Sequence, residues 1–401
     1  MSISRRTFVA AAAATALVKP SSVLPLSRRP AVSDTRFDPW LEVDGAAFLQ
    51  NVRTISELVG GRPILAVIKN DAYGLGLTTV AALLEPLPEI VGFAVVKTAA
   101  ALALREAGIR KPVLLMGLFA DEDGPELVTR DVHLSLCTED AAERVTRAIA
   151  KAGRPVHAHI YLDTGMSRMG VPYHRALPWL LEVTRLEDVQ IEGTFMGFTE
   201  DPEFDREQLR RFNTVAAEAR ERGADLGLLH AASSAAVFNF REAHLDMVRP
   251  GIALYGAYPS NEGTEREIAE LRPAFRLRAR VVRVQRLRMG DSVSYGRNYV
   301  ADKPTWIATL PVGHSDGYTR RAVDGARVLI NGGLYPVIGA VSASHAIVEL
   351  GAERTVEIGD VATLVGPDDP AIHPNALAAA TATSVYDVLM HLSAELPKRM
   401  V

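Results

Sequence analysis

The stretch ILAVIKNDAYGLG (residues 64–76) places a lysine directly after a run of apolar residues. The run Ile64–Ile68 is short and rich in β-branched side chains, which predicts a buried strand. Lys69 follows at the carboxyl end of that strand, and Gly74 and Gly76 mark a turn. Because a charged ammonium is costly to bury, the pKa of a lysine in this place is expected to fall. The same pattern is compatible with a lysine that simply leaves the core for solvent.

Around this strand, short apolar runs alternate with helical periodicity from residue 39 to about residue 256. Strand-like runs such as VGFAVV, PVLLMG and VHAHIYLD are separated by amphipathic stretches such as TAAALALREAG and DREQLRRFNTVAAEARERG. This α/β alternation over roughly eight units predicts a (β/α)8 barrel. Lys69 would then lie at the carboxyl edge of the barrel, where this fold builds its active sites. A neutral amine there is a nucleophile for an aldehyde, and pyridoxal 5′-phosphate (PLP) is the cofactor that uses this chemistry.

The pattern changes after about residue 271. Runs such as FRLRARVVRVQRL, TWIATLPVG and ARVLINGGLYPVIGAV are β-branched and separated by Gly, Pro or Asp, which predicts an antiparallel β domain. We therefore divide the chain into a signal and linker (1–34), a PLP-binding barrel (35–270) and a C-terminal β domain (271–401). A strand near the start of the barrel segment is a candidate to join the β domain.

The first residues bear on location. MSISRRTFVAAAAATALVKP places Arg5 and Arg6 before an Ala-rich, mildly apolar run that is too short for a membrane span. This is typical of a secretory signal, and SRRTFV resembles a twin-arginine signal. We expect export to the periplasm, with no stable membrane anchor once the signal is removed. The alternative is a disordered leader on a cytosolic protein.

Composition excludes several classes of protein. The 401 residues carry a formal net charge of −4, which gives no electrostatic footprint for nucleic acid. The single cysteine, Cys137, excludes a disulfide scaffold and a cysteine-based zinc site. His157 and His159 lie two apart and so share a strand face, as a zinc pair could require. No third ligand is evident, and we expect no metal.

Motifs along the chain carry a family resemblance. AVIKNDAYGLG resembles the lysine motif of the alanine racemase family, and further matches follow in family order: LDTGMSRMG, HAASSAA, MVRPGIALYG, VSYGRNY, DGYTR and TSVYDVL. Each short match is weak, but seven in the correct order are specific, and they extend from about residue 39 to the C-terminus. The resemblance implies a PLP-dependent racemase that acts on a free amino acid as a head-to-tail homodimer with shared active sites.

The resemblance also implies roles for individual residues. Lys69 matches the Schiff-base lysine, and Tyr295 matches the tyrosine that the partner subunit places opposite it. Arg249 matches the arginine facing the pyridine nitrogen, and Arg168 the one near the phenolic oxygen and the substrate carboxylate. The positions that match the phosphate site are Tyr73, Ser234, Gly251, Ile252 and Tyr386. Ala343 lies in the partner-side loop expected to contact substrate.

The chemistry of racemisation explains these residue types. A proton leaves Cα from one face and another returns to the opposite face, so two bases must flank that carbon. Lys69 would serve one face and Tyr295 the other. A tyrosine with a pKa near 10 is a weak base at neutral pH, so a nearby cation such as Arg168 or Arg249 is expected to help. Arg249, always protonated, would keep the pyridine nitrogen unprotonated and restrain side reactions such as transamination.

Several positions depart from the family pattern near the expected site. Gly197 stands where a histidine packs on the cofactor ring, and Ser233 stands where asparagine is usual. Tyr161 replaces a lysine that is often carbamylated, and His314 replaces an entrance tyrosine. Ser342, Ala343 and Ser344 replace Cys-Met-Asp, which should widen the pocket or loosen the hold on the substrate carboxylate.

These departures leave three readings of the activity. The enzyme interconverts L- and D-alanine, or it racemises larger amino acids such as Lys, Arg, Ser or Met, or it is a weakened PLP-binding homologue. A PLP decarboxylase is disfavoured because an acidic residue would be expected where Arg249 stands. A non-catalytic PLP carrier is disfavoured because the chain continues for about 130 residues beyond the barrel.

Overall fold

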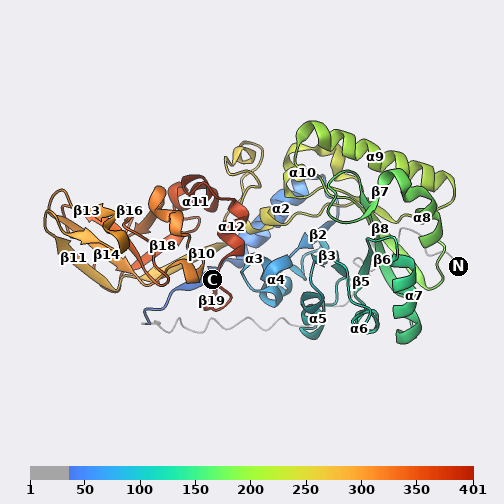
Figure 1. Cartoon of the computed structure of the whole chain (residues 1–401), viewed down its shortest axis with the longest axis horizontal. Helices are drawn as coiled ribbons and strands as arrows, with labels where there is room; N and C mark the ends of the chain where they lie inside the picture. The colour runs from blue at the N-terminus through green and yellow to red at the C-terminus, as the bar shows by residue number, and fades with distance from the viewer. Residues whose placement is uncertain (1–35) are drawn as a thin grey trace. The chain divides into compact units, whose positions relative to one another are not determined.

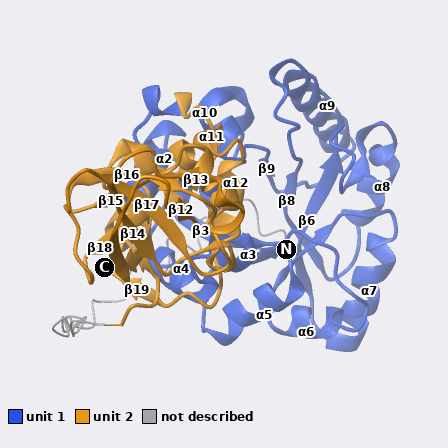
Figure 2. Ribbon diagram, turned by 60° about the vertical axis from the view of Figure 1, so that its left-hand side comes forward, with its two compact units in different colours: residues 1–13, 49–254, 265–270 blue, residues 14–48, 255–264, 271–401 orange. Residues whose placement is uncertain are grey.

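A computed structural model describes residues 36–401, which form two compact units (Figures 1 and 2). Unit 1 contains residues 49–254 and 265–270, and unit 2 contains residues 255–264, 271–401 and the described chain up to Phe48. The predicted twin-arginine signal and linker lie outside the described residues. Every helix within residues 36–401 is too short or too polar to cross a bilayer.

Unit 1 is a curled parallel sheet with helices following its strands. The sheet order is β2-β3-β4-β5-β6-β8-β9, and the short β7 pairs with β6. The strands are β2 (Ile64–Val67), β3 (Ile90–Val95), β4 (Val113–Leu115), β5 (His133–Leu136), β6 (Val156–Asp163), β7 (Val171–Pro172), β8 (Val189–Phe195) and β9 (Leu228–His230). The helices are α2 (Gly45–Leu58), α3 (Lys69–Tyr73), α4 (Leu77–Leu84), α5 (Thr98–Glu106), α6 (Gly124–Thr129), α7 (Ala141–Ala152), α8 (Ala176–Val183), α9 (Pro202–Glu221) and α10 (Ser234–Asn239).

Residues 246–250 close the barrel between β9 and β2. Arg249 N–H donates to Ala232 O at 2.8 Å on one side, and Leu65 N–H donates to Val248 O at 2.9 Å on the other. Pairing with β2 ends where Val67 N–H donates to Pro250 O at 3.0 Å, and the backbone then turns into a 3-10 helix at Ile252–Tyr255. Proline lacks an N–H donor, so the ladder cannot continue through it. The predicted (β/α)8 barrel is confirmed.

The chain makes an unusual turn directly after Lys69. Asn70, Asp71 and Ala72 all have left-handed backbone angles, with φ between 51° and 54°. Such angles cost roughly 1–2 kcal/mol per residue for L-amino acids, and Asn and Asp tolerate them best. The turn is fixed by Asp71 Oδ1, which accepts the N–H of Leu77 at 2.8 Å, and by Gly76 N–H, which donates to Asp71 O at 2.9 Å. The segment that carries Lys69 is therefore held rigidly.

Unit 2 is built on a nine-stranded sheet in the order β11-β14-β17-β16-β15-β18-β10-β1-β19. Its strands are β1 (Trp40–Val43), β10 (Phe275–Arg280), β11 (Arg283–Leu287), β14 (Thr305–Leu310), β15 (Arg327–Ile330), β16 (Gly333–Ile338), β17 (Ala346–Gly351), β18 (Val361–Val365) and β19 (Lys398–Met400), with β12 (Ser292–Val293) and β13 (Tyr299–Val300) forming a separate pair. Helices α11 (Pro374–Ala380) and α12 (Val385–Met390) follow β18. All pairs are antiparallel except β1 with β19, which confirms the predicted antiparallel β domain.

The first described strand belongs to this sheet. β1 pairs antiparallel with β10, so that Trp40 lies opposite Arg278. The Trp40 ring also faces two guanidinium groups, Arg399 at 4.3 Å and Arg280 at 5.8 Å from its centroid. Cation–π contacts of this kind add to the backbone pairing that holds the strand in unit 2.

Candidate active site

Lys69 lies at the carboxyl edge of the barrel, at the start of α3 and two residues beyond the end of β2. Its side chain is half-buried. Burial lowers the pKa of Lys69, and the positive charge of Arg168 lowers it further, while the carboxylate of Glu200 acts in the opposite direction. A larger share of neutral amine results at any given pH, and the neutral form is the nucleophile.

Arg168 reaches this region from the exposed loop after β6. The loop is ordered by Asp163 Oδ1, which accepts the N–H groups of Gly165 at 2.9 Å and Ser167 at 3.1 Å. This is the Asx-type turn that an aspartate before Thr-Gly favours, and Ser167 adopts a left-handed φ of 55° within it. The LDTGMSR motif therefore positions the arginine that acts on Lys69.

We expect the substitution Arg168→Gln to raise the pKa of Lys69. Removing a nearby cation makes the ammonium less unfavourable, so the protein must be taken to higher pH before the amine becomes neutral. The pH dependence of reductive methylation of Lys69 in PLP-free protein measures this shift. Arg175→Gln, which removes an exposed arginine paired with Glu139, is the control and should leave the profile in place. An unshifted profile in Arg168→Gln would contradict the assigned coupling.

Tyr73, Ser234 and Gly251 come together at the end of residues 246–250. Ser234 Oγ accepts the N–H of Gly251 at 3.0 Å and the N–H of Ala253 at 3.2 Å. Tyr73 Oη lies so close to Gly251 that a Cβ added there would overlap it. Among the described residues, Ile252 N–H donates to no acceptor. Hydroxyl groups and a backbone N–H thus converge in a manner suited to an anion.

Gly251→Ala tests this candidate anion site, which is formed by Tyr73 Oη, Ser234 Oγ and the N–H of Ile252. The added methyl group must displace the Tyr73 hydroxyl, at a cost of about 1–3 kcal/mol, which is a loss of roughly 5- to 150-fold in the affinity for the expected cofactor, PLP. Thr129→Ala is the control, because it removes an exposed hydroxyl whose partner is Pro125 O, outside the expected site. Fluorescence titration with PLP measures both. Equal affinities for the two variants would show that the phosphate does not sit against Gly251.

Arg249 is buried in the barrel and bonded to backbone and imidazole acceptors. Its Nη1 donates to His230 Nδ1 at 2.9 Å and His230 O at 2.5 Å, and its Nη2 donates to Met196 O at 2.6 Å. Burial lowers the pKa of Arg249 to about 10, so the guanidinium stays protonated at neutral pH. Within residues 36–401 no carboxylate pairs with it, and its Nε–H donates to no acceptor. A buried cation in this state is suited to a ligand acceptor.

Aromatic rings line the barrel wall beside Arg249. Phe195 stacks on Tyr161 with centroids 4.3 Å apart and on His230 with centroids 5.2 Å apart. An ideal Cβ at Gly197 would lie 3.5 Å from Tyr161 Oη and 3.5 Å from Met166 Sδ. Gly197 and Tyr161, which both depart from the family pattern, are therefore neighbours. The Tyr161 hydroxyl lies next to the space that a side chain at residue 197 would enter.

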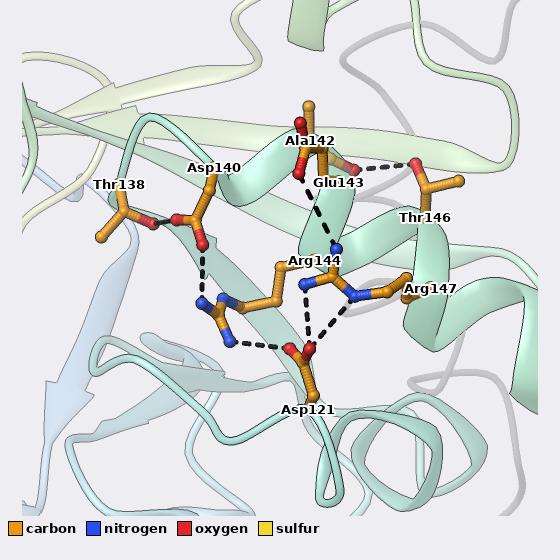
Figure 3. A network of polar contacts seen from close by, with 8 residues as sticks. All are labelled: Asp121, Thr138, Asp140, Ala142, Glu143, Arg144, Thr146 and Arg147. Atoms are coloured by element: carbon orange, nitrogen blue, oxygen red, sulfur yellow. Dashed lines mark hydrogen bonds and ion pairs between the residues drawn. The ribbon is translucent and has the colours of Figure 1, made fainter.

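An ion-pair network joins Asp121, in the loop after β4, to Arg144 and Arg147 of α7 and to Asp140 just before that helix (Figure 3). Arg144 contacts Asp121 at 2.7 Å and Asp140 at 2.6 Å, and Arg147 contacts Asp121 at 2.9 Å. Exposed pairs of this kind contribute about 0–1 kcal/mol each, so the network fixes the loops more than it stabilises the fold.

The remaining predicted site residues belong to unit 2. Tyr295 follows β12 and is 76% exposed, and the adjacent Ser294 and Arg297 have left-handed φ values of 59° and 53°. Tyr386 is half-buried in the first turn of α12. Ala343 O accepts the Ser315 N–H at 3.0 Å, so the loops containing two of the family departures, Ala343 and His314, lie together.

Three residues of the site were not predicted from the sequence. Ala253 donates its N–H to Ser234 Oγ at 3.2 Å, a contact that the motif did not indicate. Glu200 acts on Lys69 and has a left-handed φ of 67°, and Asp205 Oδ1 accepts its N–H at 3.1 Å. His230 accepts from Arg249, and its position in HAASSAA next to the expected phosphate site was the available signal. Nothing in the local sequence indicates Ala253 or Glu200, because the backbone geometry of the folded chain brings them to the site.

Comparisons with known proteins agree with this arrangement. Residues 43–259 match the model of the alanine racemase N-terminal domain, and residues 274–400 match that of the C-terminal domain. The chain is 35% identical to the alanine racemase of Carboxydothermus hydrogenoformans over 364 residues, covering 90% of this chain and 98% of that protein.

Solved structures agree as well. The alanine racemase of Streptomyces lavendulae superposes with a TM-score of 0.85 at 28% identity, covering 91% of this chain and 97% of that one. The alanine racemase of Streptomyces coelicolor superposes with a TM-score of 0.84 at 30% identity, covering 92% of this chain and 99% of that one. The resemblance seen in the motifs is confirmed: the chain belongs to the alanine racemase family.

Proposed function

We propose that this protein is a PLP-dependent racemase that interconverts L-alanine and D-alanine. The single observation that carries the proposal is a half-buried Lys69 with a lowered pKa in a chain 35% identical, over 90% of its length, to a protein named alanine racemase. This family is PLP-dependent, and the residues of this barrel fit that cofactor.

The fit rests on the chemistry of the groups that line this part of the barrel. The Nε–H of Arg249 faces no acceptor among the described residues, as a pyridine nitrogen would require. The cup of Tyr73 Oη, Ser234 Oγ and the N–H of Ile252 offers donors for a phosphate, and Gly251 leaves the space. Lys69 supplies the amine that would join the aldehyde. The proposed phosphate contact of Tyr386 is carried over from the family motif.

Each catalytic step is assigned to a residue of this chain. Bound PLP supplies an electron-withdrawing ring that stabilises negative charge at Cα. Lys69 Nζ would take or return the α-proton on one face, and Tyr295 Oη of the partner subunit on the other. Arg168 would bind the substrate carboxylate and favour deprotonation of groups near it. Arg249 would hold the ring nitrogen unprotonated, because a guanidinium with a pKa of about 10 remains a donor at neutral pH.

The proposal includes a head-to-tail dimer. Its support is the exposure of Tyr295, 76% in a single chain, because a base that must contact substrate would otherwise remain in solvent. We also propose export through the twin-arginine route, on the SRRTFV motif of the leader.

Racemisation of larger amino acids is the second candidate. The observation in its favour is the short side chains of Ala343 and Ser344 beside His314, where the family pattern has Met and Asp. Incubation with each L-amino acid, followed by chiral chromatography, separates the two. Product from alanine alone supports the first candidate, product from Lys, Arg, Ser or Met supports the second, and no D-isomer from any substrate contradicts both.

A further inference from the structure

A column of three buried histidines runs through the barrel behind Arg249. His230 on β9, His159 on β6 and His133 on β5 are each no more than 4% exposed. His230 Nε2 lies 3.0 Å from His159 Nδ1, and His159 Nε2 lies 3.5 Å from His133 Nδ1. The column therefore joins nitrogen to nitrogen from the guanidinium toward the other side of the barrel interior.

The hydrogen-bond directions in this column follow from Arg249. A guanidinium has only donors, so Nη1 must donate to His230 Nδ1, and that nitrogen must be unprotonated. The proton of neutral His230 is then on Nε2, from which it can only donate to His159 Nδ1. His159 in turn has its proton on Nε2, directed at His133 Nδ1. The donors of Arg249 are thus compatible with a single set of tautomers for the three imidazoles, provided that His159 Nδ1 accepts from His230.

The surroundings keep these three rings neutral. Burial lowers the pKa of His230 and of His159, the latter to about 3, and the charge of Arg249 lowers both further. Burial and the neighbouring His159 lower the pKa of His133. Burial and neighbouring positive charge therefore disfavour protonation of all three rings.

His157 ends the column and differs from its other members. Its ring stacks on His133 with centroids 4.8 Å apart, and its Nδ1 lies 2.7 Å from Glu192 Oε1. The hydrogen bond to Glu192 raises the pKa of His157, and Asp131 at 4.0 Å adds to this, against burial and the charge of Arg154. Stacking transmits no proton position, so His157 lies outside the directed chain.

We propose that His159 is a positioning residue that fixes the tautomer of His230 and, through it, the orientation of Arg249 toward the cofactor ring. If His230 carried its proton on Nδ1, two N–H groups would meet at 2.9 Å, and Arg249 would have to rotate away. His159 prevents this by offering an acceptor on the opposite side of the ring. The inference rests on the proposed function, because the consequence for catalysis requires PLP against Arg249.

The consequence concerns which reaction the site performs. A displaced Arg249 no longer keeps the ring nitrogen unprotonated, so the ring becomes a stronger electron sink. With PLP bound, transamination would then compete: alanine would pass its amino group and two electrons to the cofactor, reducing the aldehyde to an amine, and loss and uptake of one water would supply the oxygen of the resulting keto acid. We expect the ratio of transamination to racemisation to rise about tenfold when His159 is lost, a difference of about 1.4 kcal/mol between the two barriers.

His159→Phe, His159→Gln and His157→Phe test the proposal with two readouts. The first is the tautomer of His230 in 15N-histidine-labelled, PLP-free protein by NMR, with His230→Gln used for assignment. The second is the ratio of keto acid to D-alanine from L-alanine. We expect Nδ1 of His230 to be unprotonated in the wild type, to become partly protonated in His159→Phe, and to return in His159→Gln, whose amide both accepts and donates. The ratio of keto acid to D-alanine should likewise rise in His159→Phe and return toward the wild-type value in His159→Gln.

His157→Phe is the matched control, two residues away on the same strand. It should change neither readout. A wild-type tautomer of His230 in His159→Phe, or an equal effect of His157→Phe, would overturn the proposal. If His159→Phe does not fold, the wild-type tautomer and His159→Gln still decide it, since a protonated Nδ1 in either contradicts the directed chain. Absence of any racemisation would contradict the proposed function and leave the tautomer result intact.

Discussion

Lys69→Ala is expected to abolish racemisation, with a loss on the order of 10²–10⁴-fold or more in turnover. On the proposed mechanism, the variant lacks both the amine that would join the cofactor aldehyde and the base for one face of Cα. Borohydride reduction of the PLP-loaded wild type, followed by peptide mass analysis, should place the added pyridoxyl group on the peptide containing Lys69. The same treatment of Lys69→Ala should leave that peptide unmodified.

Lys97→Ala is the matched control for this experiment. Lys97 is an exposed lysine that follows β3, the neighbour of β2 in the barrel sheet. Its loss should change neither turnover nor the labelled peptide. Pyridoxyl label on the Lys97 peptide, or full activity in Lys69→Ala, would show that the cofactor is held elsewhere.

Tyr295→Phe is expected to reduce racemisation in both directions by about 10²–10⁴-fold while PLP binding is retained. A phenyl ring keeps the shape of the side chain but has no proton to give or accept. Because Lys69 still serves one face, the α-proton of one enantiomer should continue to exchange with solvent deuterium, and that of the other should not. NMR of each alanine enantiomer in D2O measures this difference.

Tyr335→Phe is the control, since it removes a tyrosine hydroxyl of unit 2 whose partner is Thr355. It should leave both exchange rates unchanged. Undiminished racemisation in Tyr295→Phe would assign the second base to another residue.

Much of the barrel can be predicted from the sequence because its strands are short apolar runs between amphipathic helices. The run Ile64–Val67 and the lysine after it are examples, since a parallel sheet buries both faces of its strands. Two local features could not be predicted. The left-handed turn at Asn70–Ala72 contradicts the ordinary preference of alanine, and hydrogen bonds to Asp71 from later residues hold it in place.

Some residues of the site can likewise be predicted from local sequence motifs, and others cannot. Lys69, Tyr73 and Arg249 each lie in a recognisable local motif, so their types and order along the chain indicate their place. The column of His133, His159 and His230 has no such motif, because its members come from three separate strands and meet only when the barrel closes. The spacing of His157 and His159 in VHAH predicts that they share a strand face, but their partners on β5 and β9 depend on the order of strands in the sheet, which periodicity does not give.

The most direct test of the account is the fate of the α-proton. Purified, PLP-loaded protein is incubated with L-alanine in D2O, and the first D-alanine formed is isolated by chiral chromatography and analysed by mass spectrometry. Two bases on opposite faces predict D-alanine that carries deuterium at Cα, because the group that delivers the new proton exchanges with solvent. D-alanine that retains the original protium would show that one group moved the proton between faces, and would contradict the pairing of Lys69 with Tyr295.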